Sequence, residues 1–257
     1  MPRRRSYDQY CAAARALDTV GDRWALLIVR ELLAGPRRYT DLHADLPGVS
    51  TDVLASRLRD MERDELVTRR KLPPPAAAVV YELTPRGAGL LPVLGALAAW
   101  GAPDLGEPGP TDAVRAHWFA LPMLRILGER AGAAAGTVDV RLDEGTFHVH
   151  LGAAPAPRPA GAAGASEAMP ASGAAHARDA ARGAGGAAGT AVAAVARVPG
   201  TAYGEGPAPA GPDAALALDT ATCRALCGGT LAFAEAVGAG SVVVEGDGPL
   251  AKALRGP

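Results

Sequence analysis

Apolar residues recur at helical spacing through the first hundred positions, and glycine or proline interrupts them at intervals. The run over residues 22–34 predicts a helix that Asp22 caps and Gly35 ends, because glycine followed by proline is typical of a helix C-terminus. Residues 39–46 predict a second, shorter helix, which ends where Pro47 follows.

A further helix, over residues 50–64, is predicted from its cap and its apolar stripe. Ser50 is a preferred N-cap residue, because its hydroxyl accepts a backbone N–H bond. Leu54, Leu58 and Met61 recur at i, i+4 and i+7, which places them on one buried face. The same spacing decides which side of this helix faces outward.

Two extended runs, residues 66–72 and 79–84, follow that helix and are joined by a loop of prolines and alanines. Residues 85–100 predict another helix, with Pro85 at its first position. Short helices separated by a tight turn and followed by a hairpin predict a winged helix-turn-helix. An ordinary mixed domain is the alternative, and the hairpin directly after the helix disfavours it.

The composition then divides the chain into residues 1–103, a Pro/Gly linker over 104–111, and a second domain over 112–257. Within the second domain, residues 153–190 are mostly Ala, Gly, Pro and Ser. They bury too little apolar area to offset the entropy of ordering, so this segment is predicted to be a disordered insertion.

The second domain is predicted to open with a helix and a hairpin. Val114, Trp118, Leu121 and Leu124 fall on one helical face, and the alternation over residues 138–151 predicts two antiparallel strands with one apolar side. Further strands are predicted over 190–198, 214–218 and 241–245, and helices over 221–226, 231–237 and 249–254. The predicted fold class is therefore α+β multidomain: a winged helix-turn-helix followed by an α/β domain.

Charge and cysteine content bear on the binding partners and the cellular compartment of the protein. Residues 1–103 carry 15 Lys and Arg against 12 Asp and Glu, whereas the remainder carries 11 against 15. This modest basic excess does not by itself identify a nucleic-acid binder. The three cysteines, the absence of a signal-peptide core and the absence of an apolar run of about 20 residues predict a cytoplasmic protein without membrane partners.

The outward face of the helix over residues 50–64 predicts how DNA would be contacted. Arg59 is the best single candidate for a base or phosphate contact, because it lies opposite the buried stripe. The alternative is an ordinary solvated face, and Asp52 on this face counts against DNA. The residues predicted to contact DNA are Arg37, Arg38, Ser50, Thr51, Ser56, Arg57, Arg59, Arg63, Arg69, Arg70 and Lys71.

A family resemblance covers about residues 8–101. It is carried by Cys11, Gly21-Asp22-Arg23-Trp24, Arg38-Tyr39-Thr40-Asp41-Leu42, Leu54 with Arg57-Leu58, and Tyr81-Glu82-Leu83-Thr84. These segments resemble the HxlR family of bacterial regulators. The resemblance implies a homodimer, joined through the helix near Cys11 and the helix ending at Trp100, that binds double-stranded DNA at inverted repeats, mostly as a repressor.

The chain departs from the family pattern at three places. Glu65 stands where the family usually has glycine, and at positive φ it would cost about 1 kcal/mol. Alanines 76–78 stand at the wing tip, where the family tends to be basic. Asp52 replaces a position that is often neutral or basic in the family.

Cys11 has two interpretations. Some family members sense quinones, aldehydes or oxidants through a cysteine near this position, which a positive charge such as Arg15 or a helix N-terminus would activate. The alternative is a small apolar residue packed at the dimer contact.

The C-terminal stretch, residues 216–254, resembles the end of sterol-carrier-protein-like domains. This resemblance implies a cavity for a lipid-like or other apolar molecule. The candidates for its lining are Trp118, Leu121, Met123, Leu124, Leu127, Phe147, Val149 and Phe233, with filling of an ordinary core as the alternative.

No cofactor, metal site or catalytic residue is predicted. His148 and His150 alternate on a strand without a companion ligand, and Cys223 and Cys227 lack the further ligands that zinc needs. The leading hypothesis is a regulator controlled by an apolar effector. A lipid carrier that keeps the helix-turn-helix for dimerisation is the alternative, and an enzyme has no catalytic residues to support it.

Overall fold

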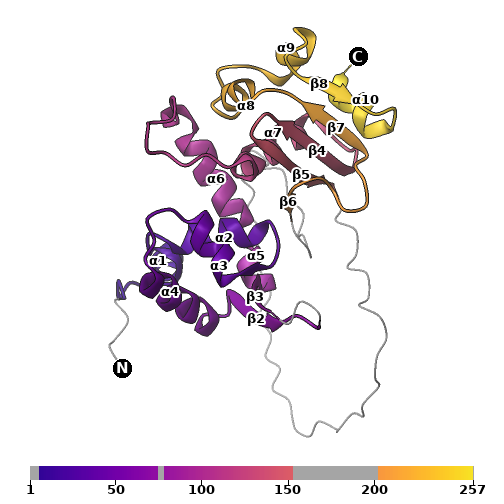
Figure 1. Cartoon of the computed structure of the whole chain (residues 1–257). Coiled ribbons are helices and arrows are strands. Elements are labelled where there is room, and N and C mark those ends of the chain that lie inside the picture. Colours follow the sequence, from indigo (N-terminus) through magenta and orange to yellow (C-terminus); the bar gives the residue numbers. More distant parts are fainter. Residues whose placement is uncertain (1–5, 75–77, 153–201, 257) are drawn as a thin grey trace, which may run out of the picture.

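The computed structural model describes residues 6–74, 78–152 and 202–256. It is a mixed α/β chain with an N-terminal helix-turn-helix region, from α1 to η1, and a separate C-terminal sheet region, from η2 to α10. Figure 1 shows the N-terminal helices below the C-terminal sheet, with α6 running between them. The predicted insertion over 153–190 and the predicted strand over 190–198 lie outside the described residues.

Four helices open the chain, and the three that follow Gly21 match the predicted order. Asp22 does not cap the second helix, because a turn intervenes: its carboxylate accepts the Trp24 N–H, and Trp24 occupies the N-cap position. The helices are α1 (Ala12–Val20), α2 (Ala25–Leu33), α3 (Tyr39–Asp45) and α4 (Thr51–Arg63).

The predicted hairpin is confirmed as β2 (Val67–Lys71) paired with β3 (Val79–Leu83). A third strand, β1 (Arg37–Arg38), pairs with the other edge of β3, with Arg37 opposite Tyr81. Two residues are too few to show an alternating pattern, which is why β1 was not predicted. The sheet order is β1-β3-β2.

The single helix predicted over residues 85–100 is instead two helices, α5 (Pro85–Ala88) and α6 (Leu91–Gly101). Pro92 explains the break, because inside a continuous helix its ring would clash with the carbonyl group four residues earlier. It lies in the first turn of α6, where proline is tolerated.

The C-terminal region is built on a five-stranded sheet in the order β6-β5-β4-β7-β8. Only the β4–β7 pair is parallel, and the predicted hairpin is confirmed as β4 and β5, with Leu142 opposite Gly145. The strand β6 is not apparent in the sequence, because Tyr203, Gly204 and Glu205 form neither an apolar run nor an alternating pattern, unlike the valine-rich β8. The strands are β4 (Gly136–Leu142), β5 (Gly145–Leu151), β6 (Tyr203–Glu205), β7 (Ala214–Ala217) and β8 (Val243–Glu245).

Helices surround this sheet, and α7 and α10 both contact it. The helix predicted from Val114 begins later, as a 3-10 turn, and Val114 lies before it. The helical segments are η1 (Ala102–Asp104), η2 (Ala116–Phe119), α7 (Ala120–Ala131), α8 (Thr220–Cys227), α9 (Phe233–Gly238) and α10 (Pro249–Arg255). No helix among the described residues is long and apolar enough to span a membrane.

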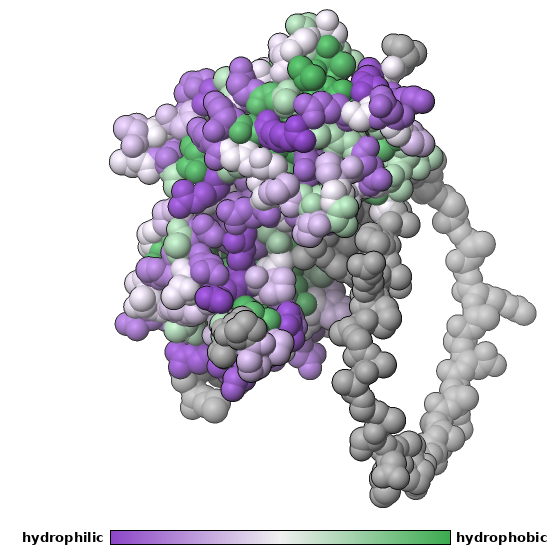
Figure 2. All heavy atoms as spheres, turned by 45° about the vertical axis from the view of Figure 1, so that its right-hand side comes forward, coloured by the Kyte–Doolittle hydropathy of each residue, from purple (hydrophilic) through white to green (hydrophobic). Residues whose placement is uncertain are grey.

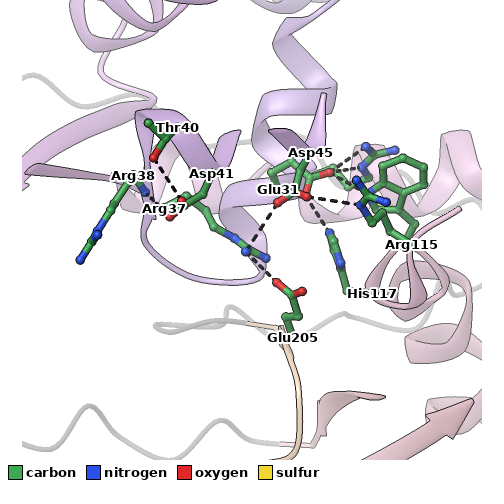
Figure 3. A network of polar contacts seen from close by, with 11 residues as sticks. Glu31, Arg37, Arg38, Thr40, Asp41, Asp45, Arg115, His117 and Glu205 are labelled. Carbon is green, nitrogen blue, oxygen red and sulfur yellow. Dashed lines mark hydrogen bonds and ion pairs between the residues drawn. The ribbon is translucent and has the colours of Figure 1, made fainter. Parts of the chain in front are cut away.

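The two regions meet at a seam that contains buried charge. Glu31 on α2 has no exposed surface, and it accepts hydrogen bonds from Arg30 at 2.8 Å and from the Trp118 indole at 2.9 Å. The Nε2 atom of His117 lies 2.8 Å from the same carboxylate. The Tyr203 hydroxyl on β6 donates to the Arg30 carbonyl at 2.6 Å. Figure 3 shows the contact between Glu31 of the N-terminal region and His117 of the C-terminal region.

The balance of effects at Glu31 favours its charged form. Burial pushes the pKa of Glu31 up, but the His117 hydrogen bond and the charges of Arg30 and His117 outweigh burial. The pKa therefore lies below its ordinary value. A weak signal for this site is present in the sequence: Glu31 follows Ile28 by three positions and so falls on the apolar face of its helix.

Candidate nucleic-acid interface

A short turn sets α4 against α3. Gly48 in this turn has φ +83°, a conformation that glycine adopts without strain. The Tyr39 hydroxyl donates to the Thr51 carbonyl at 2.7 Å, which ties the start of α3 to the start of α4. As predicted, Ser50 is the N-cap of α4, and its hydroxyl accepts the Val53 N–H at 3.3 Å. These bonds fix the orientation of the N-terminal end of α4.

The two faces of α4 are those that the sequence predicts. Leu54, Leu58 and Met61 are buried and hold the helix against the core. The opposite side is polar: Thr51, Asp52, Arg59 and Arg63 are exposed, while Ser56 and Arg57 are half-buried. This arrangement leaves an outward polar face of about three turns available to a partner.

The three arginines of α4 differ in their partners. Arg57 pairs with Asp22 at 3.4 Å and with Asp60 at 3.1 Å. Arg63 also reaches Asp60, at 2.6 Å. Arg59 donates to the Ala55 carbonyl at 3.2 Å and has no carboxylate partner within the described ranges. Arg59 is therefore the α4 arginine whose charge is least compensated.

The two arginines before α3 are placed differently, although both were predicted to contact DNA. Arg37 turns inward, where its guanidinium lies 2.7 Å from Glu205 and 3.7 Å from Asp45, and its side chain is only 14% exposed. Its charge is thus used at the seam (Figure 3). Arg38 is exposed, and its guanidinium has no ion pair in the part of the chain that is described.

The basic residues of β2 lie on an exposed strand. Arg69 pairs with Glu62 at 2.6 Å and Arg70 with Glu82 at 2.9 Å. Lys71 is exposed, without an ion pair among the described residues. Of the wing tip, residues 75–77 lie outside the described residues, so the structure does not describe the predicted loss of basic charge there.

Glu65 adopts the left-handed backbone conformation that is expected at this position, where the HxlR family usually has glycine. Its φ is +57°, in the left-handed region that disfavours side chains with a Cβ atom. The following N–H, of Leu66, donates back to the Met61 carbonyl at 2.9 Å, as in a glycine-terminated helix. The Thr84 hydroxyl donates to the Glu65 carbonyl and helps to hold the turn.

Cys11 is exposed at the N-cap of α1. The backbone N–H groups of Ala14 and Ala13, at the start of the helix, lower the pKa of its thiol. Arg15 does not contribute to this shift, and its guanidinium lies 3.8 Å from Asp18. The lowered pKa of the thiol therefore comes from the N-terminus of α1.

Large apolar side chains are exposed on α1, on α6 and on the chain before α1. Tyr10 is fully exposed and Trp100 is 79% exposed. The others in these segments are Tyr7, Leu17, Val93 and Leu97. Figure 2 shows a different distribution on the face it displays, where hydrophilic side chains dominate the lower part and the larger apolar area lies near the top, over the C-terminal region.

Most of the residues predicted to line an apolar pocket in the C-terminal region lie in its core. Six are buried and one, Leu124, packs against the core; these are Leu121, Met123, Leu124, Leu127, Phe147, Val149 and Phe233. A cavity of about 680 Å³ is present, but it lies at the seam, and of the predicted lining residues only Trp118 borders it. Helical and strand periodicity identifies apolar faces, but it does not predict which of these faces pack together without leaving a cavity.

The model of the family described as HxlR-like helix-turn-helix matches residues 19–107. The transcriptional regulator YodB of Bacillus subtilis is 38% identical over 96 residues, which cover 37% of this chain and 85% of YodB. The uncharacterised regulator YvaP of the same organism is 37% identical over 86 residues, covering 34% of this chain and 80% of YvaP.

A solved structure of the reduced form of YodB aligns with 34% identity, covering 39% of this chain and 99% of that chain, at a TM-score of 0.34. The relatives are transcriptional regulators of the helix-turn-helix type, and most of their length is matched by this chain. With the capped helix α4, its exposed polar face and the β2–β3 hairpin, this similarity shows that the chain belongs to the HxlR-like family of helix-turn-helix transcriptional regulators.

Proposed function

We propose that this protein is a sequence-specific DNA-binding repressor that inserts α4 into the major groove. The observation that carries the proposal is the outward face of α4, which presents Thr51, Ser56 and Arg59 opposite its buried stripe. Hydroxyl groups bond to base edges, and a guanidinium binds guanine O6 and N7 with two hydrogen bonds. Arg38 and Lys71, which lack carboxylate partners among the described residues, are suited to phosphate.

The proposed active form is a homodimer. Tyr10, Leu17, Leu97 and Trp100 expose apolar surface on α1, on α6 and just before α1. A large exposed apolar patch typically marks an interaction surface. Pairing two copies through these helices would bury it, and two-fold symmetry then calls for an inverted-repeat operator with half-sites about one helical turn apart.

The test is a fluorescence-anisotropy titration of the full chain against DNA from upstream of its own gene, at several salt concentrations. The expected result is preferential binding to an inverted repeat, with an affinity that falls steeply with salt, since each phosphate contact contributes about 0.9 to the slope. Light scattering in the same buffer should give the mass of a dimer. Equal affinity for the repeat and for a scrambled duplex would overturn the proposal.

The C-terminal region supports a second, finer part of the proposal. We infer that it is a sterol-carrier-like ligand-binding module, because α7 and α10 pack on a mixed five-stranded sheet and a cavity is bordered by η2, α7 and α8 of this region. The alternative function is a lipid carrier that uses the helix-turn-helix for dimerisation, which exposed Asp52 on the face of α4 favours. Loss of all DNA preference with ligand binding retained would favour the carrier.

A further inference from the structure

A cavity of about 680 Å³ lies between the two regions of the molecule. Part of its wall comes from α2 and α6, part from η2, α7 and α8, and part from the loop that joins α6 to η2. Its volume falls within the roughly 300–1,000 Å³ that is usual for small-molecule sites. It is therefore large enough for a molecule of one or two rings.

Three aromatic residues contribute to the apolar part of the lining. Trp24, Trp118 and Phe119 border the cavity together with aliphatic residues such as Leu27 and Leu105. Aromatic walls of this kind favour a flat ring system or a compact aliphatic body. An ion without an apolar body would leave most of this surface unused.

Three arginines, Arg30, Arg115 and Arg224, also border the cavity, and two of them are committed elsewhere. Arg30 binds the buried carboxylate of Glu31 at 2.7 Å and lies 4.3 Å above the Trp118 ring. Arg115 lies 3.5 Å from Asp45 at the seam. Displacing either carboxylate would leave a charge at the seam without its partner, which is costly.

Arg224 on α8 differs from these two. Its partner is Glu107, at 2.7 Å, and the Glu107 side chain is 83% exposed whereas that of Arg224 is only 22% exposed. An ion pair with such an exposed carboxylate stabilises the protein little, because water screens the charge and the side chain loses freedom. An incoming anion can therefore take the place of Glu107, and a guanidinium binds a planar carboxylate with two parallel hydrogen bonds.

We propose that this cavity binds a small amphipathic anion, with its apolar body against Trp24 and Trp118 and its carboxylate or other acidic group on Arg224. The binding itself stands on the cavity, whereas its role as an effector rests on the proposed function. The ligand would contact α2 and α6 as well as α8, so it would touch both regions of the molecule. DNA binding is affected if the ligand's affinity differs between the free and DNA-bound forms.

The test uses two fluorescent probes that share an aromatic body. One is 1-anilinonaphthalene-8-sulfonate, which is anionic, and the other is N-phenyl-1-naphthylamine, which has the same rings without the charge. Titrated into the full chain without DNA, the anionic probe should bind at one site per chain. In Arg224→Gln its affinity should fall about tenfold or more, as expected for a charged hydrogen bond, while that of the neutral probe stays within about twofold.

Two further variants make the test specific. Arg125→Gln is the matched control, because Arg125 on α7 pairs with exposed Glu129 and does not border the cavity; it should bind both probes as the wild type does. Gly101→Leu places a side chain in the lining where no atom lies within 4 Å of the new Cβ. It should weaken both probes while circular dichroism shows an unchanged fold.

Anionic-probe affinity that is the same in Arg224→Gln as in the wild type would overturn the proposal. So would several equivalent sites per chain, or equal binding in Gly101→Leu. Because no DNA is present, these results are independent of operator binding. Failure of the proposed function would leave the probe results unchanged.

Discussion

Arg59 of α4 and the arginines of the seam show opposite uses of the same side chain. Arg59 lies on an exposed helix face and has no carboxylate partner within the described ranges. At the seam, Arg30, Arg37 and Arg115 each lie within 4 Å of a carboxylate. Water compensates an exposed charge, whereas a buried charge needs a partner of opposite sign. The partner, rather than the residue type, distinguishes a surface available to DNA from one that joins two regions.

The largest effect is expected from breaking the seam. Glu31→Ala removes the carboxylate that Arg30, His117 and Trp118 share, and leaves Arg30 with its charge uncompensated. The free energy of unfolding should fall by about 3–5 kcal/mol, measured by urea denaturation. Glu129→Ala, which removes an exposed carboxylate, should change it by less than about 1 kcal/mol. Equal effects of the two variants would contradict the assignment of the seam as a buried network.

Lowering the pH should weaken the same network around Glu31. The pKa of Glu31 is lowered in the folded protein, so its contribution to stability is present above its unfolded pKa of about 4.3 and is lost as pH falls through the folded value. Stability of the wild type should therefore decline on acidification through this range. In Glu31→Gln this part of the decline should be absent, which denaturation at a series of pH values would show. An identical decline in the variant would contradict the prediction.

The next largest effect is expected at the α4 face. Arg59→Ala should weaken operator binding by about 1–3 kcal/mol, because an uncompensated guanidinium is lost from the proposed reading face. Arg37→Ala is the matched comparison: it should alter stability through the loss of Glu205 and Asp45 contacts and leave operator affinity nearly unchanged in folded protein. Fluorescence anisotropy measures operator affinity and urea denaturation measures stability, so together they separate the two effects. The reverse pattern would exchange the roles of the two arginines.

A smaller effect is expected at the end of α4. Glu65→Gly should raise the free energy of unfolding by about 1 kcal/mol, since glycine adopts φ +57° without the strain of a side chain. Gly48→Ala, in the turn before α4, should have the opposite sign, because its φ is +83° and no neighbour lies within 4 Å to complicate the comparison. Thermal denaturation of the two variants measures both changes in stability. A destabilised Glu65→Gly protein would show that the Glu65 side chain matters more than its backbone.

The smallest effect concerns Cys11, for which redox sensing and packing at a dimer contact are the two interpretations. Because the N-terminus of α1 lowers the pKa of its thiol, alkylation of Cys11 by iodoacetamide should reach half its maximal rate at a lower pH than for a free cysteine. Cys223 and Cys227 are buried, and their mutual hydrogen bond and burial raise the pKa of Cys223. Mass spectrometry should find them unmodified until the protein is unfolded. Modification of all three at one rate would contradict this difference.

Local features of the sequence determined the helix-turn-helix and the β4–β5 hairpin of the C-terminal region. The Ser50 cap, the spacing of Leu54, Leu58 and Met61, and the alternation over residues 138–151 predicted elements that the structure contains. Each depends on residues a few positions apart, so one stretch of chain carries the whole signal. The division of α5 from α6 depended on a proline whose effect was not foreseen.

Only the tertiary structure decided which charges are compensated and where the cavity lies. Glu31 and His117 are 86 positions apart in the chain, and Arg37 and Glu205 are 168 positions apart. No local pattern links such residues, because their contact depends on how the strands β4, β5 and β6 pair and on how α6 meets α7. Most of the residues predicted to line a pocket lie in the core, and a cavity lies where the two regions meet.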